Sequence, residues 1–362
     1  MDRCQNGRKA CRESLRECRG NLHEVRSDRK ACREKLQEVR SDRKACRESL
    51  RACRESQRRG DILAYICNFL GNSVAVIDCK TDTLIKTIST LNHGNRISGP
   101  EGIALSPDRT SVYATNADQA NLSIIRTMDQ TLTGTIEMLN TPRKIAVFSD
   151  GKKAYVTTAG NNSVAVIDLI NQNVTNTIPV GMAPFGIALS PDNGKAYVVN
   201  EDDSTLSIVD TMTETQVDNF PIGPGPLCIA ILPDGTKAYV TNESNANVSV
   251  IHLSNNQLSF ISVGAGPFGV AVSPNGERVI VTNGNTNTVS VIDPQIDQVI
   301  KTITVGLNPF GVAFTPDGTK AYVTNYRDNS ISIIDIQKLT VTNTFAVGNG
   351  PIGVTIGQIA SS

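Results

Sequence analysis

One position of a recurring motif carries side chains that could bind a ligand. The motif contains a proline, and the residue after it is, in chain order, Glu101, Arg143, Phe185, Leu227, Phe268, Phe310 and Ile352. An acid and a base thus occupy two consecutive repeats, and the other five side chains are apolar. A carboxylate beside a guanidinium forms a strong paired contact. Two interpretations stay open: an apolar channel plug with one ion pair, or a ligand site centred on Glu101 and Arg143.

An insertion lies close to the first of these residues. The step from Asp78 to Arg126 is 48 residues, whereas later steps between equivalent positions are 41 or 42. The extra residues fall around Leu91–Ser98 and would bring His93 and Arg96 to the same face as Glu101. Insertions in one loop of a regular array often carry function, although neutral variation of a surface loop explains the length equally well.

The remaining polar residues favour no catalytic or metal chemistry. Residues 61–362 hold only two histidines, His93 and His252, and His252 stands where other repeats have a turn-forming Asp. This is too few for a multi-histidine metal or haem site. No P-loop, zinc-type Cys spacing or Ser–His–Asp set is present. The acidic run 201–203 could contact a cation but fits a solvated turn better. We therefore expect neither a metal nor a cofactor.

The elements that would position these residues repeat seven times. A phrase resembling KAYVTN is followed each time by one resembling SVAVID, at intervals of about 42 residues. With the Pro-containing segment before it and a Thr-rich segment after it, each unit has the alternation and β-branched content of four strands. The sequence therefore predicts an all-β, seven-bladed β-propeller of four-stranded blades over residues 61–362.

The two ends of this array complement each other. It begins with a second strand, Leu63–Cys67, and ends with a first strand that starts at Gly350 and Pro351. The last strand can therefore complete the first blade, in a closure of three strands plus one that leaves no open edge.

Residues 1–59 have a different pattern. They repeat with a period of fourteen residues, which is two heptads, and predict an α-helical coiled coil before the propeller. Its apolar seam comprises Cys11, Leu15, Cys18, Leu22, Val25, Cys32, Leu36, Val39, Cys46, Leu50 and Cys53. Arginines in the seam favour a small parallel oligomer over a tightly packed core. Adjacent cysteines of one helix lie about 10.5 Å apart along the axis, so they either pack reduced or form disulfides between chains.

The predicted coiled coil and the predicted propeller differ in net charge. Residues 1–60 hold 19 Lys and Arg against 10 Asp and Glu, and the rest of the chain holds 16 against 25. The acidic, aromatic-poor composition of the propeller argues against nucleic acid as a partner. No apolar run is long enough for a membrane span, and no secretory leader is recognisable. The default expectation is a cytoplasmic protein.

The repeated phrases resemble the YVTN-type β-propeller repeats of archaeal surface-layer proteins and related bacterial proteins. The resemblance covers essentially all of 61–362, and the absence of tryptophan disfavours WD40 repeats. It implies the propeller fold and an exported or surface-associated setting for many members. These include surface-layer components, nucleic-acid-binding proteins, and relatives of lactonases and of haem-bearing reductases.

Together these patterns favour a non-enzymatic binding or scaffold protein. It would self-associate through the coiled coil and present a propeller face to an unknown protein or small-molecule ligand. The candidate ligand residues are Glu101, Arg143, His93, Arg96, Phe185, Phe268 and Phe310. One alternative is a lactonase-like hydrolase that uses Glu101, Arg143 and His93. The other is a protein that binds single-stranded nucleic acid.

Overall fold

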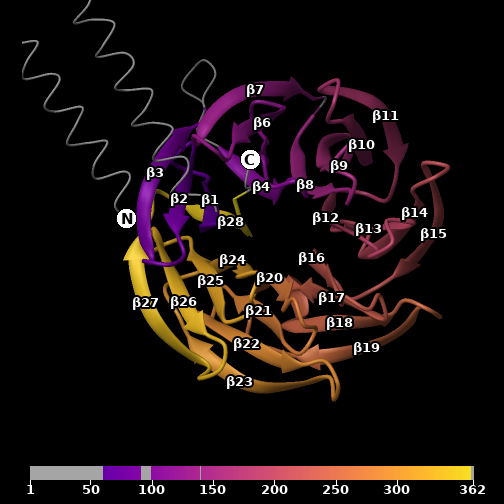
Figure 1. Ribbon diagram of the computed structural model, residues 1–362. Coiled ribbons are helices and arrows are strands. Elements are labelled where there is room, and N and C mark those ends of the chain that lie inside the picture. The colour runs from indigo at the N-terminus through magenta and orange to yellow at the C-terminus, as the bar shows by residue number, and fades with distance from the viewer. Residues whose placement is uncertain (1–59, 91–98, 139, 360–362) are drawn as a thin grey trace, which may run out of the picture. The chain divides into compact units, whose positions relative to one another are not determined.

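The computed structural model describes residues 60–90, 99–138 and 140–359. These residues form seven antiparallel sheets of four strands each. Figure 1 shows the sheets as blades around a central opening, with one strand of each blade innermost and one at the perimeter. The propeller prediction is therefore confirmed. The predicted coiled coil, residues 1–59, lies outside the described residues.

Each blade contributes one strand to the central opening and a second strand beside it. The innermost strands are β4 (Pro100–Leu105), β8 (Pro142–Val147), β12 (Pro184–Leu189), β16 (Pro226–Ile231), β20 (Pro267–Val272), β24 (Pro309–Phe314) and β28 (Pro351–Gln358). The second strands are β1 (Ile62–Asn68), β5 (Ser111–Asn116), β9 (Lys153–Thr158), β13 (Lys195–Asn200), β17 (Lys237–Asn242), β21 (Val279–Asn283) and β25 (Lys320–Asn325).

The other two strands complete each blade outward. The third strands are β2 (Ser73–Asp78), β6 (Asn121–Arg126), β10 (Ser163–Asp168), β14 (Thr205–Asp210), β18 (Asn247–His252), β22 (Thr288–Asp293) and β26 (Ser330–Asp335). The outer strands are β3 (Thr83–Ser89), β7 (Thr131–Glu137), β11 (Asn173–Pro179), β15 (Thr215–Pro221), β19 (Gln257–Ser262), β23 (Gln298–Thr304) and β27 (Thr340–Ala346). The short 3-10 helices η1 (Ala159–Asn161) and η2 (Glu243–Asn245) follow two of the second strands. No helix in the described part of the chain is long and apolar enough to cross a membrane.

The core lies between neighbouring blades. Second and third strands are buried along almost their whole length, because both of their faces pack on other sheets. One cluster, for example, joins Tyr155 and Val164 of one blade to Ile187 and Val198 of the next. The outer strands are more exposed: in β11 only Val174 and Ile178 are partly or fully buried, as expected for a strand with one face in solvent.

The acid that ends most third strands organises the following turn. Asp168 Oδ1 accepts hydrogen bonds from the backbone N–H groups of Ile170 at 2.9 Å and Asn171 at 2.8 Å. The same contact recurs at Asp210, whose Oδ1 accepts from Met212 and Thr213. The recurring Asp is therefore explained by turn geometry, and His252, which takes its place in one blade, ends β18 at such a turn.

The ring closes through the two ends of the array. Strand β28 pairs antiparallel with β1, with Leu63 opposite Gly357 and Ile66 opposite Val354. The sheet order is β28-β1-β2-β3, so the first blade takes its innermost strand from the end of the chain. The predicted three-plus-one closure is confirmed.

Candidate functional site

Each innermost strand carries a bulge directly after its proline. In β4 the register runs Pro100 opposite Asn116 and then Ile103 opposite Ala114, so Glu101 and Gly102 share one partner position. The same shift recurs in the other six blades. A bulge bends a strand and re-aims its side chains. Both residues after the proline, and not only the first, are therefore candidates to face the channel.

In five of the seven blades a threonine hydroxyl opposite the bulge joins the blade to the next. Thr115 Oγ1 accepts a hydrogen bond from Gly102 N–H at 2.8 Å and donates to the Arg143 carbonyl of the next blade at 2.6 Å. Equivalent bonds to the next blade come from Thr157, Thr241, Thr282 and Thr324. This bonding holds the channel-facing segments at a defined spacing, which is the preorganisation that a binding site needs.

Three charged side chains meet on one side of the channel. Glu101 is buried, with 4% of its surface exposed. Its Oε2 accepts a hydrogen bond from Arg143 Nη1 at 2.8 Å, and its Oε1 lies 3.9 Å from Lys144 Nζ. A buried carboxylate is costly unless it is paired. The structure therefore brings together Glu101 and Arg143, as the sequence suggested, and adds Lys144 as a third member.

Aromatic side chains continue the row of channel residues beyond these three charged groups. Phe185 and Phe268 pack edge to face at 5.7 Å between centroids, and Phe268 and Phe310 lie 4.1 Å apart. Tyr326, after the end of β25, extends the row with its ring 5.2 Å from that of Phe310. Lys144 Nζ lies 5.3 Å from the Phe185 centroid and 5.9 Å from that of Phe268, so its charge faces two ring surfaces.

Two channel residues occupy positions that are glycine in the other blades. Lys144 and Cys228 are the second residues after their prolines, where the motif otherwise reads Pro-x-Gly. A Cβ at Gly186, by comparison, would lie 2.4 Å from the Leu227 carbonyl oxygen. A side chain at this position therefore needs space that the glycine-containing blades do not have. Sequence reasoning missed both residues, and the signal that could have found them was this departure from glycine.

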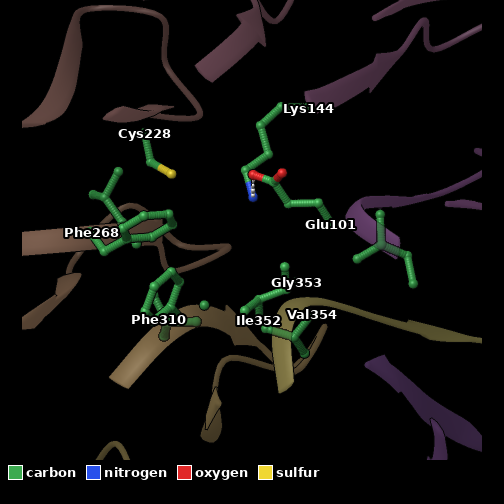
Figure 2. A pocket seen from close by; sticks show the side chains of 13 residues that line it. Glu101, Lys144, Cys228, Phe268, Phe310, Ile352, Gly353 and Val354 are labelled. Atoms are coloured by element: carbon green, nitrogen blue, oxygen red, sulfur yellow. Dashed lines mark ion pairs between the residues drawn. The ribbon is translucent and has the colours of Figure 1, made fainter. Parts of the chain in front are cut away.

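A cavity of about 120 Å³ lies within the channel at this place. Figure 2 shows Glu101 and Lys144 on one side of it, Phe268 and Phe310 on another, and Cys228 between them. Its apolar lining also includes Ile103, Val270, Val312, Ile352 and Val354. Burial raises the pKa of the Cys228 thiol to about 11, against the opposing effect of the Lys144 charge. The thiol is thus neutral at physiological pH, and the polar chemistry of the cavity belongs to Lys144 and Glu101.

The acidic run 201–203 follows β13, in the loop to the third strand of its blade. Asp203 Oδ2 accepts the Met182 N–H at 2.5 Å and so supports the loop before β12. Burial and the nearby Asp202 charge raise the pKa of Glu201, while Arg143 opposes the shift. Among the described residues no group of three or more His, Cys, Asp or Glu side chains could hold a metal ion.

Other predicted site residues are not placed at the cavity. His93 and Arg96 lie outside the described residues, as do all the seam residues of the predicted coiled coil. Phe185 contacts the site through Lys144 and Phe268 and is itself buried. Leu227 is buried as well. Cys67 and Cys79 are free thiols buried within the blades.

Solved structures of other proteins share this fold. Hydrazine synthase from Kuenenia stuttgartiensis superposes with a TM-score of 0.66 at 21% identity, over 73% of this chain and 89% of the other. A functionally unknown protein from Desulfotomaculum acetoxidans gives 0.71 at 18% identity, over 82% and 99%. A putative 6-phosphogluconolactonase from Bacteroides fragilis gives 0.68 at 16% identity, over 82% and 98%. At such identities the likeness shows the fold alone.

Comparison at the level of sequence gives a family. No curated protein matches the chain significantly. The family model described as the choice-of-anchor I domain matches residues 71–197 and 186–352, which together span most of the propeller. The chain therefore belongs to the choice-of-anchor I domain family.

Proposed function

We propose that this chain is a non-enzymatic binding protein that holds its ligand at the propeller channel and works in association with a cell surface. Membership of the choice-of-anchor I domain family supports the surface setting. The resemblance of the repeats to YVTN-type surface-layer propellers supports it further.

The observation that carries the proposal is the composition of the channel cavity. Glu101 and Lys144 lie on one side, and the rings of Phe268 and Phe310 face them. Ligand sites combine an apolar lining with a few convergent polar groups, and this cavity has that composition. Among the described residues the Glu101 carboxylate is paired with Arg143, and His93, which the hydrolase alternative requires, lies outside them.

The second part of the proposal concerns residues 1–59. Their heptad pattern would join several chains through the seam cysteines, leucines and valines. Several propellers on one assembly would then present copies of the same site, and multivalency raises a weak affinity without new contacts.

A fragment screen by ligand-observed NMR tests the binding site. We expect hits on the full-length protein to lose saturation transfer in a Phe268→Ala/Phe310→Ala variant, because the cavity loses its aromatic wall. Phe260→Ala is the matched control, since that ring is 53% exposed on the outer strand β19. Hits that respond equally to both variants would place binding elsewhere and contradict the proposal.

The lactonase-like alternative is favoured only by the fold it shares with the Bacteroides protein. It would use Glu101 and Arg143 together with His93. Incubation with a panel of lactones, including δ-gluconolactone and γ-butyrolactone, distinguishes the two functions. We expect no turnover. Hydrolysis that disappears in Glu101→Gln would establish the enzyme instead.

Binding of single-stranded nucleic acid is the remaining alternative. It predicts an affinity for oligonucleotides that falls steeply with salt concentration. The excess of acidic over basic residues after residue 60 argues against it, and we expect no binding by the propeller at physiological ionic strength.

A further inference from the structure

The ammonium group of Lys144 is held in the channel with most of its hydrogen-bonding capacity unused. It makes no hydrogen bond to the described residues, and its contact with Glu101 Oε1, at 3.9 Å, is longer than a hydrogen bond. An ammonium has three N–H donors. The side chain is only 19% exposed, so bulk water does not surround it as it would a surface lysine. A group with acceptor atoms would complete this site.

The charges at the site favour an anion. Arg143 faces two acids, because it pairs with Glu101 at 2.8 Å and its charge also opposes the rise in the pKa of Glu201 that burial causes. The remaining positive charge lies on Lys144. Cys228 adds none, because its thiol stays protonated at neutral pH. A singly charged anion would pair with the Lys144 ammonium, whereas a doubly charged one would carry more negative charge than this ammonium can balance.

The rest of the cavity favours an apolar body of small size. Its walls are formed by Phe268, Phe310, Ile352, Ile103 and Val354. Its volume of about 120 Å³ is close to that of the engineered cavity of roughly 150 Å³ that binds benzene, so a ligand of about benzene's size would fit. A ligand with one carboxylate and a short alkyl chain satisfies both the charge and the walls.

We propose that the channel cavity binds a short-chain aliphatic monocarboxylate, with its carboxylate on Lys144 Nζ and its alkyl chain between Phe268 and Phe310. This inference rests on the proposed binding function and specifies the class of its ligand. Glu101 acts through Arg143 and Lys144 as a positioning residue, because it holds the two cations on one side of the cavity.

The test is an NMR titration of the full-length protein with acetate, propionate and butyrate. We expect affinity to rise with chain length up to butyrate, because each methylene adds apolar contact. Butyramide has the same shape without the charge and should bind at least tenfold more weakly. Inorganic phosphate should also bind at least tenfold more weakly. Butyramide or phosphate binding as well as butyrate would overturn the assignment.

Substitutions test whether the ligand contacts Lys144 and Cys228. Lys144→Met removes the ammonium and should weaken butyrate binding at least tenfold, whereas Lys152→Met, at an exposed turn before β9, should leave it unchanged. Unchanged butyrate affinity in Lys144→Met would overturn the proposal. Cys228→Gly restores the motif glycine and enlarges the cavity, so it should shift the preferred chain length upward; an unchanged preference would contradict the placement of the alkyl chain.

The outcomes separate this inference from the proposed function. If carboxylates fail to bind but fragments still depend on Phe268 and Phe310, the cavity is a binding site for another ligand class. If neither carboxylates nor fragments depend on these rings, the proposed function fails as well.

Discussion

Individual side chains near the start of the second strands connect neighbouring blades. Lys320 Nζ pairs with Asp82 Oδ2 at 2.8 Å, and Tyr322 Oη donates to Asp82 Oδ1 at 2.5 Å. Lys237 and Tyr239 make the same two contacts with Asp297. In each case a lysine and a tyrosine that begin a second strand bind an acid in a turn of the next blade. The Lys320 contact joins the last blade to the first and so supports the ring closure.

Asp82→Asn should destabilise the fold by about 2 kcal/mol, because it removes the charge that pairs with Lys320 and leaves one acceptor oxygen for Lys320 and Tyr322. Asp150→Asn is the control: its carboxylate only accepts a backbone N–H from Lys152 at an exposed turn, which an amide oxygen can replace. We expect that variant to stay within about 0.5 kcal/mol of the parent. Chemical denaturation measures both, and equal stabilities would contradict a closing role for Asp82.

Cys228 should react slowly with iodoacetamide at neutral pH. Burial raises its pKa to about 11, so the reactive thiolate is scarce and the alkylation rate should rise about tenfold per pH unit between pH 7 and 10. Because this pKa lies above that of an unfolded-chain thiol, about 8.5, the thiol's contribution to stability is complete below that pH and declines above it. Peptide mass spectrometry follows the modification, with glutathione as the unperturbed reference. A rate that levels off near pH 9 would contradict the raised pKa.

The element that decides whether the propeller forms is β28. It is the innermost strand of the first blade, yet it comes from the far end of the chain and pairs with β1. Without it the first blade would expose the inner edge of β1, with unpaired backbone groups and the buried side chains of Tyr65 and Ile66. Closure therefore depends on a contact between residues that are almost three hundred positions apart.

A chain that ends at Gly350 should not fold cooperatively. Removal of β28 takes away one of the four strands of the first blade, together with its contacts to β24 and β4, its neighbours in the inner ring. The control is a chain that ends at Ile359, which retains β28 and should melt like the full-length protein. Thermal unfolding monitored by circular dichroism compares the two. A cooperative transition in the shorter chain would show that closure is not required.

The bulge in each innermost strand determines which side chains can face the channel. Sequence reasoning identified the first residue after each proline as channel-facing but did not consider the second. The bulge sets both residues opposite one partner position, as with Glu101 and Gly102 opposite Thr115. A pattern of alternating residues cannot reveal such a shift, because it is a local break in the strand register. The departure from glycine at Lys144 and Cys228 was visible in the sequence, but its meaning depends on this geometry.

At the scale of the whole molecule, charge divides the chain. Residues 1–60 carry an excess of basic side chains, and the remainder carries an equal excess of acidic ones. The net charge of the chain is therefore zero although neither part is neutral. Such a division fits two parts with separate roles, assembly and binding, as proposed above.

Light scattering of the full chain and of residues 61–362, each with and without reductant, tests the assembly role. We expect an oligomer for the full chain and a monomer for the propeller alone, because the heptad seam lies entirely before residue 60. Loss of mass on reduction would show interchain disulfides through the seam cysteines. A monomeric full chain in every condition would remove the multivalent mechanism and leave a single-site binding protein.

The sequence alone determined the architecture, because all seven repeats show the same pattern of strands and turns. Even the closure followed from the missing first strand at one end and the surplus strand at the other. The tertiary structure decided which side chains meet. Glu101, Lys144, Cys228 and Phe310 come from four different blades, and their distances depend on blade packing and on the bulge. Local patterns encode strands, whereas a channel site is made by residues far apart in the chain, and only the folded ring sets their geometry.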